Sequence, residues 1–170
     1  MRAAETRDHK EQIRIIDNAG SAYAALGDTR EAIKLHERAL VMARETHRPR
    51  DECTALHNLG RRHFALGNVR RAIELHQQAL VLARQTGILQ IECETLYDLA
   101  IAFGLLKDVG VAIRYAESAL KIALATESPL ADVIVATMGK WRRKNASSHR
   151  TPKSYPTGLK RVKERQRKKN

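Results

Sequence analysis

The sequence predicts an all-α solenoid of three helix-turn-helix repeats, followed by a capping helix and a disordered basic tail. Two segments recur every 40 residues, one at 18–28, 58–68 and 98–108 and the other at 30–36, 70–76 and 110–116. A fixed period of this size indicates a solenoid, because each unit of a solenoid buries its apolar face against its neighbours. Only 4% of the residues are aromatic, so small and aliphatic side chains must form the core.

Each repeat starts with a helix that ends at a leucine and a short turn. These leucines are Leu26, Leu66 and Leu106. Gly27–Asp28 and Gly67–Asn68 form the first two turns, because Gly adopts the left-handed conformation at a helix end and Asp or Asn caps the next helix. The third turn, Lys107–Asp108, keeps the cap and lacks the glycine. We therefore expect the third turn to be strained or looser.

The second helix of each repeat carries a regular apolar face. In the first repeat this face consists of Ala32, Ile33, Ala39, Leu40 and Ala43, and the same residues recur in the other two repeats. Their spacing places them on one side of a helix. The pattern predicts helices near 8–26, 29–46, 51–66, 69–86, 89–106 and 109–126, with inter-repeat turns at 47–50 and 86–87.

A seventh helix is expected to follow Ser128–Pro129, with Ser as its cap and Pro in its first turn. It should run toward Asn145, although residues 139–142 break the repeat pattern. We expect it to cover the open face of the third repeat, as terminal elements of solenoids do. The repeats then occupy about 10–48, 50–88 and 90–128 of a repeat domain at 1–138, and residues 139–170 form the basic end of the capping helix and the tail.

The net charge of +12 lies entirely in residues 139–170. Residues 1–138 contain 18 basic and 18 acidic residues, whereas 139–170 contain 13 basic residues and a single acid. The basic run consists of Lys160, Arg161, Lys163, Arg165, Arg167, Lys168 and Lys169. Three interpretations stay open: an arm for nucleic acid or an acidic membrane surface, a nuclear-import signal in a eukaryote, or a terminus without an evolved role. Binding to nucleic acid would be non-specific, because no aromatic residues interleave the charges.

The two cysteines, Cys53 and Cys93, are one period apart and occupy an apolar packing position. Equivalent points in stacked helical units lie on the order of 10 Å apart, which is too far for a disulfide. Reduced cysteines suit the cytosol. No secretory signal and no membrane-spanning segment are recognisable in the sequence. We therefore expect a cytoplasmic protein, with a nuclear location as the alternative in a eukaryote.

The sequence contains no pattern of a catalytic or metal site. His36 and His76 are equivalent by period and are expected to be structural, while His57 and His63 lack cysteine or carboxylate partners at ligand spacing. Neither a nucleophile elbow nor a phosphate-binding glycine loop nor a zinc pattern is present. We expect no catalytic residue, no metal and no cofactor.

The repeat resembles the tetratricopeptide repeat over about residues 10–126. The resemblance rests on the Leu59–Gly60 pair, the Gly-Asp/Asn turns, the Ala39–Leu40 ending and the side chains of Tyr23, His63 and Phe103. The period exceeds the family's usual length of about 34 residues. It is similar to the longer variant in Leu-Gly-Asn-repeat G-protein modulators and in arrays attached to bacterial NTPase or regulator proteins.

The resemblance implies a right-handed superhelix whose concave groove is lined by the first helix of each repeat. The implied peptide-binding residues are Asp17, Asn18, Ser21, His57, Asn58, Arg61, Phe64, Tyr97, Ile101 and Leu105. In the family, Asn18 and Asn58 stand where an amide often holds a peptide backbone, whereas Asp98 departs from that pattern. The basic and aromatic middle repeat beside an apolar third repeat would suit an acidic ligand with apolar anchors. Alternatively, Arg61 and its basic neighbours form a solvated rim balanced by Glu31, Glu37 and Glu74.

These patterns favour an adaptor that binds a peptide or helix of a partner protein in the groove. The alternative is a nucleic-acid-associated or acidic-surface-binding protein that acts through the basic tail. A third hypothesis is that the chain is a piece of a longer repeat array. Three repeats are close to the minimum for a stable solenoid, so self-association through an exposed end is also expected.

Overall fold

The computed structural model describes the backbone of residues 2–148 and the side chains of residues 8–144. This part of the chain consists of seven helices and contains no strand, which confirms the predicted all-α fold. The helices are α1 (Arg2–Ala25), α2 (Thr29–Glu45), α3 (Pro49–Ala65), α4 (Val69–Thr86), α5 (Leu89–Leu105), α6 (Val109–Ala125) and α7 (Leu130–Ser148). The predicted basic run at 160–169 lies outside the described residues.

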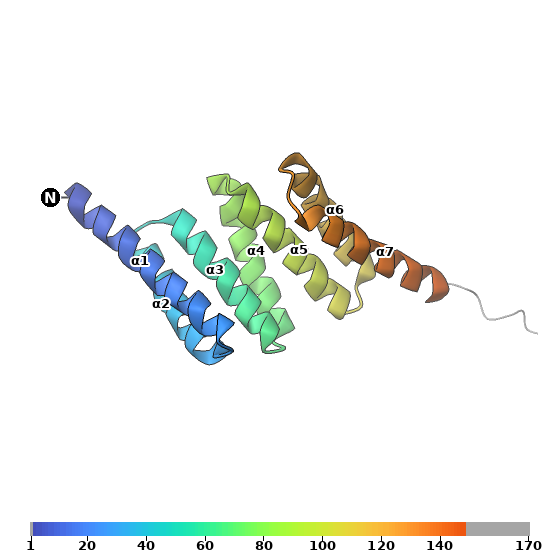
Figure 1. Ribbon diagram of the computed structural model, residues 1–170, viewed down its shortest axis with the longest axis horizontal. Helices are drawn as coiled ribbons and strands as arrows, with labels where there is room; N and C mark the ends of the chain where they lie inside the picture. Colours follow the sequence, from blue (N-terminus) through green and yellow to red (C-terminus); the bar gives the residue numbers. More distant parts are fainter. Residues whose placement is uncertain (1, 149–170) are drawn as a thin grey trace, which may run out of the picture.

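The helices stack in chain order as two layers (Figure 1). Helices α1, α3 and α5 form one layer, with direct contacts from α1 to α3 and from α3 to α5. Helices α2, α4 and α6 form the other layer, and each packs against the first helix of its own repeat and of the next. No helix in the described part is both long enough and apolar enough to cross a bilayer.

The predicted turn chemistry is confirmed at the glycines. Gly27 and Gly67 have φ angles of 89° and 78°, and Lys107 adopts the same left-handed conformation with a φ of 65°. A side chain in this conformation is sterically disfavoured, so the third turn is strained as expected. Asp28 and Asp108 cap α2 and α6 by accepting from the backbone N–H of Glu31 and Val111. The expectation for Asn68 was wrong, because its side chain makes no capping hydrogen bond.

Three helix starts differ from the prediction. Helix α7 begins at Leu130, so Pro129 lies in the turn before the helix rather than in its first turn. Helix α1 begins at Arg2, six residues before the predicted start. Helix α3 begins at Pro49 rather than within a turn that extends to residue 50, because Pro is compatible with the first position of a helix. The turn is instead made at His47, whose φ is 52°.

The core is built from small residues at period-equivalent positions. Ala39, Ala79 and Ala119 are completely buried, and so are Ala43, Ala83 and Ala123. The two cysteines are buried and unbridged, and each thiol donates a hydrogen bond to a backbone carbonyl one helix further along, that of Ala79 or Ala119. Burial raises the pKa of Cys53 to about 11. The predicted packing role of the cysteines is therefore confirmed.

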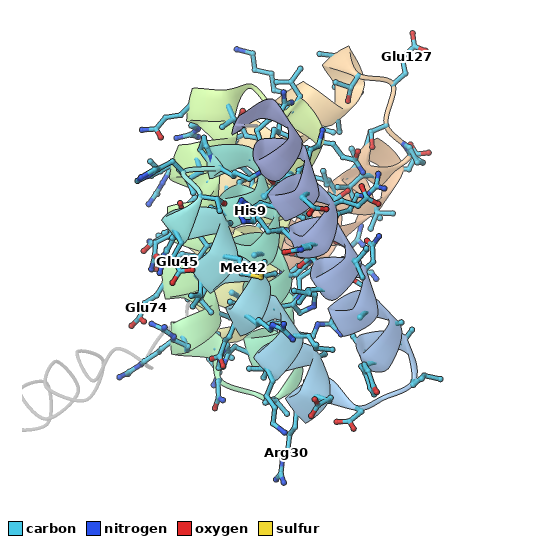
Figure 2. All side chains as sticks on the ribbon, turned by 90° about the vertical axis from the view of Figure 1, so that its left-hand side faces the viewer. His9, Arg30, Met42, Glu45, Glu74 and Glu127 are labelled. Atoms are coloured by element: carbon cyan, nitrogen blue, oxygen red, sulfur yellow. The ribbon has the colours of Figure 1, made fainter. Side chains whose placement is uncertain are left out.

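The two ends of the solenoid differ in how far their apolar residues are covered. At the C-terminal end, α7 packs on α6, and Ile134 and Met138 are buried in the same cluster as residues of α5 and α6. At the N-terminal end, which faces the viewer in Figure 2, Ile15 is 58% exposed. The equivalent positions in the next two repeats, Ala55 and Thr95, are completely buried. The first repeat therefore leaves uncovered a position that the other repeats bury.

Candidate binding groove and buried polar junctions

Three hollows lie on the layer formed by α1, α3, α5 and α7. The largest hollow has a volume of about 880 Å³ and lies between α5 and α7, with Tyr97, Leu130 and Val133 in its lining. A second hollow, of about 280 Å³, is lined by Phe64 and Ile101 among others. The third, of about 370 Å³, lies over the first two repeats. Arg61 lines all three hollows, so this residue lies where they adjoin.

Donor groups dominate the third hollow. Its lining includes the side chains of Ser21, Asn58, Arg61 and Arg62, and no acidic residue. The predicted rim carboxylates are engaged elsewhere: Glu31 pairs with Lys34, and Glu74 pairs with Arg71. Arg61 itself forms no ion pair with any described residue. This hollow, which we call the donor hollow, therefore offers hydrogen-bond donors and positive charge to a ligand.

The structure brings six of the predicted groove residues to the hollows. These are Ser21, Asn58, Arg61, Phe64, Tyr97 and Ile101. Asn18 and Leu105 are exposed and border none of the three hollows. Their predicted contact with a ligand stays a prediction.

Asp17 and His57 differ from the prediction, because both side chains are buried between helices. Asp17 is 9% exposed and His57 is 4% exposed. The Asp17 carboxylate accepts hydrogen bonds from Nδ1 of His36 at 2.7 Å and from Nδ2 of Asn58 at 2.9 Å. Both of its oxygens are thus occupied within the protein. The three residues form a saturated polar junction between α1, α2 and α3.

The equivalent junction between the second and third repeats carries different residues. Forty positions on from Asp17 and Asn58 stand His57 and Asp98, and His76 is the equivalent of His36. The two imidazole rings are 5.7 Å apart between centroids. Nε2 of His76 lies 3.8 Å from Oδ2 of Asp98, and Nε2 of His57 lies 3.4 Å from Oε2 of Glu94. Both carboxylates come from α5, so spacing along a single helix could not have revealed them.

Close packing holds His36 and His76 in place. Each imidazole lies against a glycine of the preceding helix, Gly20 for His36 and Gly60 for His76. A Cβ atom built on Gly60 would lie only 2.6 Å from Cε1 of His76. Both histidines are 1% exposed and lie among packing residues, as expected from their positions on the second helices.

Burial governs the ionisation of the second junction. Loss of solvent lowers the pKa of His76 to about 3, and the nearby His57 and Arg61 act in the same direction. Burial raises the pKa of Asp98, against the opposing effect of His57 and Arg61. The contact with His57 lowers the pKa of Glu94. At neutral pH the His76 imidazole is therefore neutral, with a lone pair on one ring nitrogen.

Comparison with known proteins identifies the repeat. A family model described as tetratricopeptide repeat matches residues 11–85 and again 51–125. The search of curated proteins returned no match.

Solved structures share the fold at low sequence identity. The apo form of RapI has a TM-score of 0.75 at 16% identity, covering 81% of this chain and 50% of its own. A putative kinesin light chain of Podosopora anserina with nearly identical TPR-like repeats has a TM-score of 0.69 at 22% identity, covering 81% and 68%. The TPR domain of Arabidopsis FLU has a TM-score of 0.62 at 20% identity, covering 69% and 98%. The chain thus spans half the length of RapI and nearly all of the FLU domain.

Proposed function

Since this chain belongs to the tetratricopeptide repeat family, whose fold generally serves as a scaffold for protein–protein interaction, we propose that it is an adaptor that binds a partner's peptide or helix on its concave surface. The observation that carries the proposal is the position of Arg61. This residue lines three adjoining hollows and forms no ion pair with a described residue. An unpaired cation at the centre of a concave surface favours an anionic ligand.

The linings of the hollows suggest how such a ligand is oriented. An aspartate or glutamate side chain fits the donor hollow, where an Arg guanidinium and an Asn amide can both donate to a carboxylate. Apolar side chains of the ligand fit beside Phe64 and Ile101, or beside Tyr97 and Leu130. The largest hollow also contains Glu94 and Glu127, which disfavour an acidic group there. We therefore propose a segment that combines an acidic residue with apolar residues toward the α7 end.

A peptide library displayed on phage tests this proposal directly. Selection on the purified full chain should enrich segments with an acidic residue next to apolar residues. Arg61→Glu should abolish binding of the enriched peptides, because it places a negative charge between the three hollows. Arg70→Glu is the matched control, since Arg70 is exposed and lines none of the hollows. Circular dichroism should show unchanged helix content in both variants.

Two results would contradict the groove. Enriched peptides without an acidic residue would remove the role of the donor hollow. Equal binding by the wild type and Arg61→Glu would remove the whole concave surface as the binding site.

The charge distribution favours a second candidate function, association with nucleic acid through the basic tail. All of the +12 net charge lies in residues 139–170. With about seven phosphate contacts, the logarithm of the binding constant should fall with a slope of roughly −5 to −6 against the logarithm of salt concentration. Filter binding of the full chain and of residues 1–148 separates the functions. A truncation at 148 keeps all of α7, including Trp141, whereas one at 138 would cut the helix. Equal binding by residues 1–148 would contradict this function.

A further inference from the structure

Two buried histidines and a partly exposed aspartate converge where the second repeat meets the third. His57 comes from α3, His76 from α4 and Asp98 from α5. One ligand atom of each lies within 4.8 Å of those of the other two. The imidazoles are 4% and 1% exposed, whereas the Asp98 side chain is 29% exposed.

The saturated junction in the first repeat shows what is unusual about this cluster. There, Asp17 accepts from both His36 and Asn58, and every member has a partner. In the second junction, Nε2 of His57, Nδ1 of His76 and Oδ2 of Asp98 are buried and have no hydrogen-bond partner among the described residues. Such atoms are rare in native proteins and call for an explanation, for which a bound ion is one of the recognised kinds.

We propose that His57, His76 and Asp98 bind a divalent transition-metal ion, and that Zn²⁺ is the best match. Two imidazoles and a carboxylate are a common ligand set for zinc. Ligands at the zinc–nitrogen and zinc–oxygen distances of about 2.0–2.1 Å stand about 3.4 Å apart at the corners of a tetrahedron. Nε2 of His76 and Oδ2 of Asp98 are 3.8 Å apart, and the ligand atoms of the three residues all lie within 4.8 Å of one another, so the side chains must move closer together to reach this spacing.

A neighbouring group orients His57 in the site. Nδ1 of His57 lies 2.9 Å from the buried hydroxyl of Thr95. When Nδ1 donates to that hydroxyl, Nε2 carries the lone pair, which is how metal-binding histidines are generally held.

A hollow gives an ion access to the cluster, and the charges that line this hollow limit the affinity of the site for a cation. His76 and Asp98 line the hollow of about 280 Å³, which connects the cluster to the concave face. Arg61 and Arg62 line the same hollow, and their positive charge opposes a cation. A bound ion would join three consecutive helices, so it would stabilise the contact between the second and third repeats.

The test uses the untagged full chain and the metal alone. Co²⁺ should bind at one equivalent and give an intense visible absorption band, and Zn²⁺ should displace it. Zn²⁺ should also raise the melting temperature. Asp98→Asn should weaken the binding of Zn²⁺ at least tenfold. Mutation of a residue that only hydrogen-bonds a metal ligand already lowers metal affinity by about that factor. This substitution introduces the residue type that occupies the equivalent positions 18 and 58.

The double variant His57→Asp/Asp98→Asn provides the control for folding. It reproduces the residue types of the hydrogen-bonded first junction, so it should keep the helix content and lose both the Co²⁺ band and the Zn²⁺-dependent rise in melting temperature. The proposal is overturned if the wild type shows no stoichiometric band. It is also overturned if the double variant keeps the band, because the ion would then be bound elsewhere on the chain.

Discussion

Asp17 and His36 are joined by a buried hydrogen bond of 2.7 Å between Oδ1 and Nδ1, which ties α1 to α2. The other oxygen of Asp17 accepts from Asn58, so the same carboxylate ties α1 to α3. In a solenoid each repeat contacts only its neighbours, and stability depends on such interfaces. One side chain therefore links the first repeat internally and to the second repeat.

Asp17→Ala should lower the free energy of unfolding by about 2–3 kcal/mol, because it leaves the buried His36 without its partner and removes an acceptor from Asn58. Asn18→Ala, at the exposed neighbouring position, should change it by less than about 0.5 kcal/mol. Urea unfolding followed by circular dichroism measures both. A loss no greater than that of the Asn18 variant would show that the Asp17 interactions are unimportant for stability.

Gly60→Ala should destabilise the protein because the new Cβ would meet the imidazole of His76 at 2.6 Å. Overpacking of this kind costs about 1–3 kcal/mol. Gly110→Ala is the matched control, since a Cβ atom there meets nothing closer than 3.9 Å. Gly110 is the second residue of α6, so alanine there should stabilise by no more than about 0.5 kcal/mol, the lower end of the value for the middle of a helix. If both variants shift the unfolding midpoint in the same direction, close packing between α3 and α4 does not limit residue 60.

The fold could be predicted from the sequence because the residues that determine it recur from one repeat to the next. Glycine turns, buried alanines and the cysteine position repeat with the period, so a single sequence shows each of them more than once. The surface positions of some candidate residues could also be predicted, since Arg61 and Phe64 do line a hollow. The burial of Asp17 and His57 could not be predicted from the sequence, because it depends on which helix faces pack together between neighbouring repeats. Thr95, the partner of His57, lies 38 residues away on another helix.

Lys107→Gly should stabilise the protein, because Lys107 is the third-repeat counterpart of Gly27 and Gly67 and has a left-handed φ of 65°. The left-handed conformation costs a non-glycine residue roughly 1–2 kcal/mol, and glycine removes this cost. Part of the resulting gain in stability is offset, because glycine has greater freedom in the unfolded chain. We therefore expect a net gain of about 0.5–1 kcal/mol. The reciprocal variant Gly67→Lys should lose about 1 kcal/mol. Thermal unfolding of both variants tests this prediction. A lower melting temperature for Lys107→Gly would mean that contacts of the lysine compensate for the strain in the third turn.

Trp141→Ala should loosen the capping helix, because the indole of Trp141 lies flush against Gly104. A Cβ atom on Gly104 would be 2.7 Å from Cζ2 of the ring. Removing a large, half-buried aromatic side chain should cost about 2 kcal/mol, below the 3–5 kcal/mol of a fully buried one. Lys140→Ala, at the exposed preceding position, serves as the control. Hydrogen exchange of the α7 and α5 amides is the measurement. Faster exchange confined to these helices in the Trp141 variant is expected from an end cap whose loss exposes the third repeat. Unchanged exchange in α5 would mean that α7 does not stabilise the repeat beneath it.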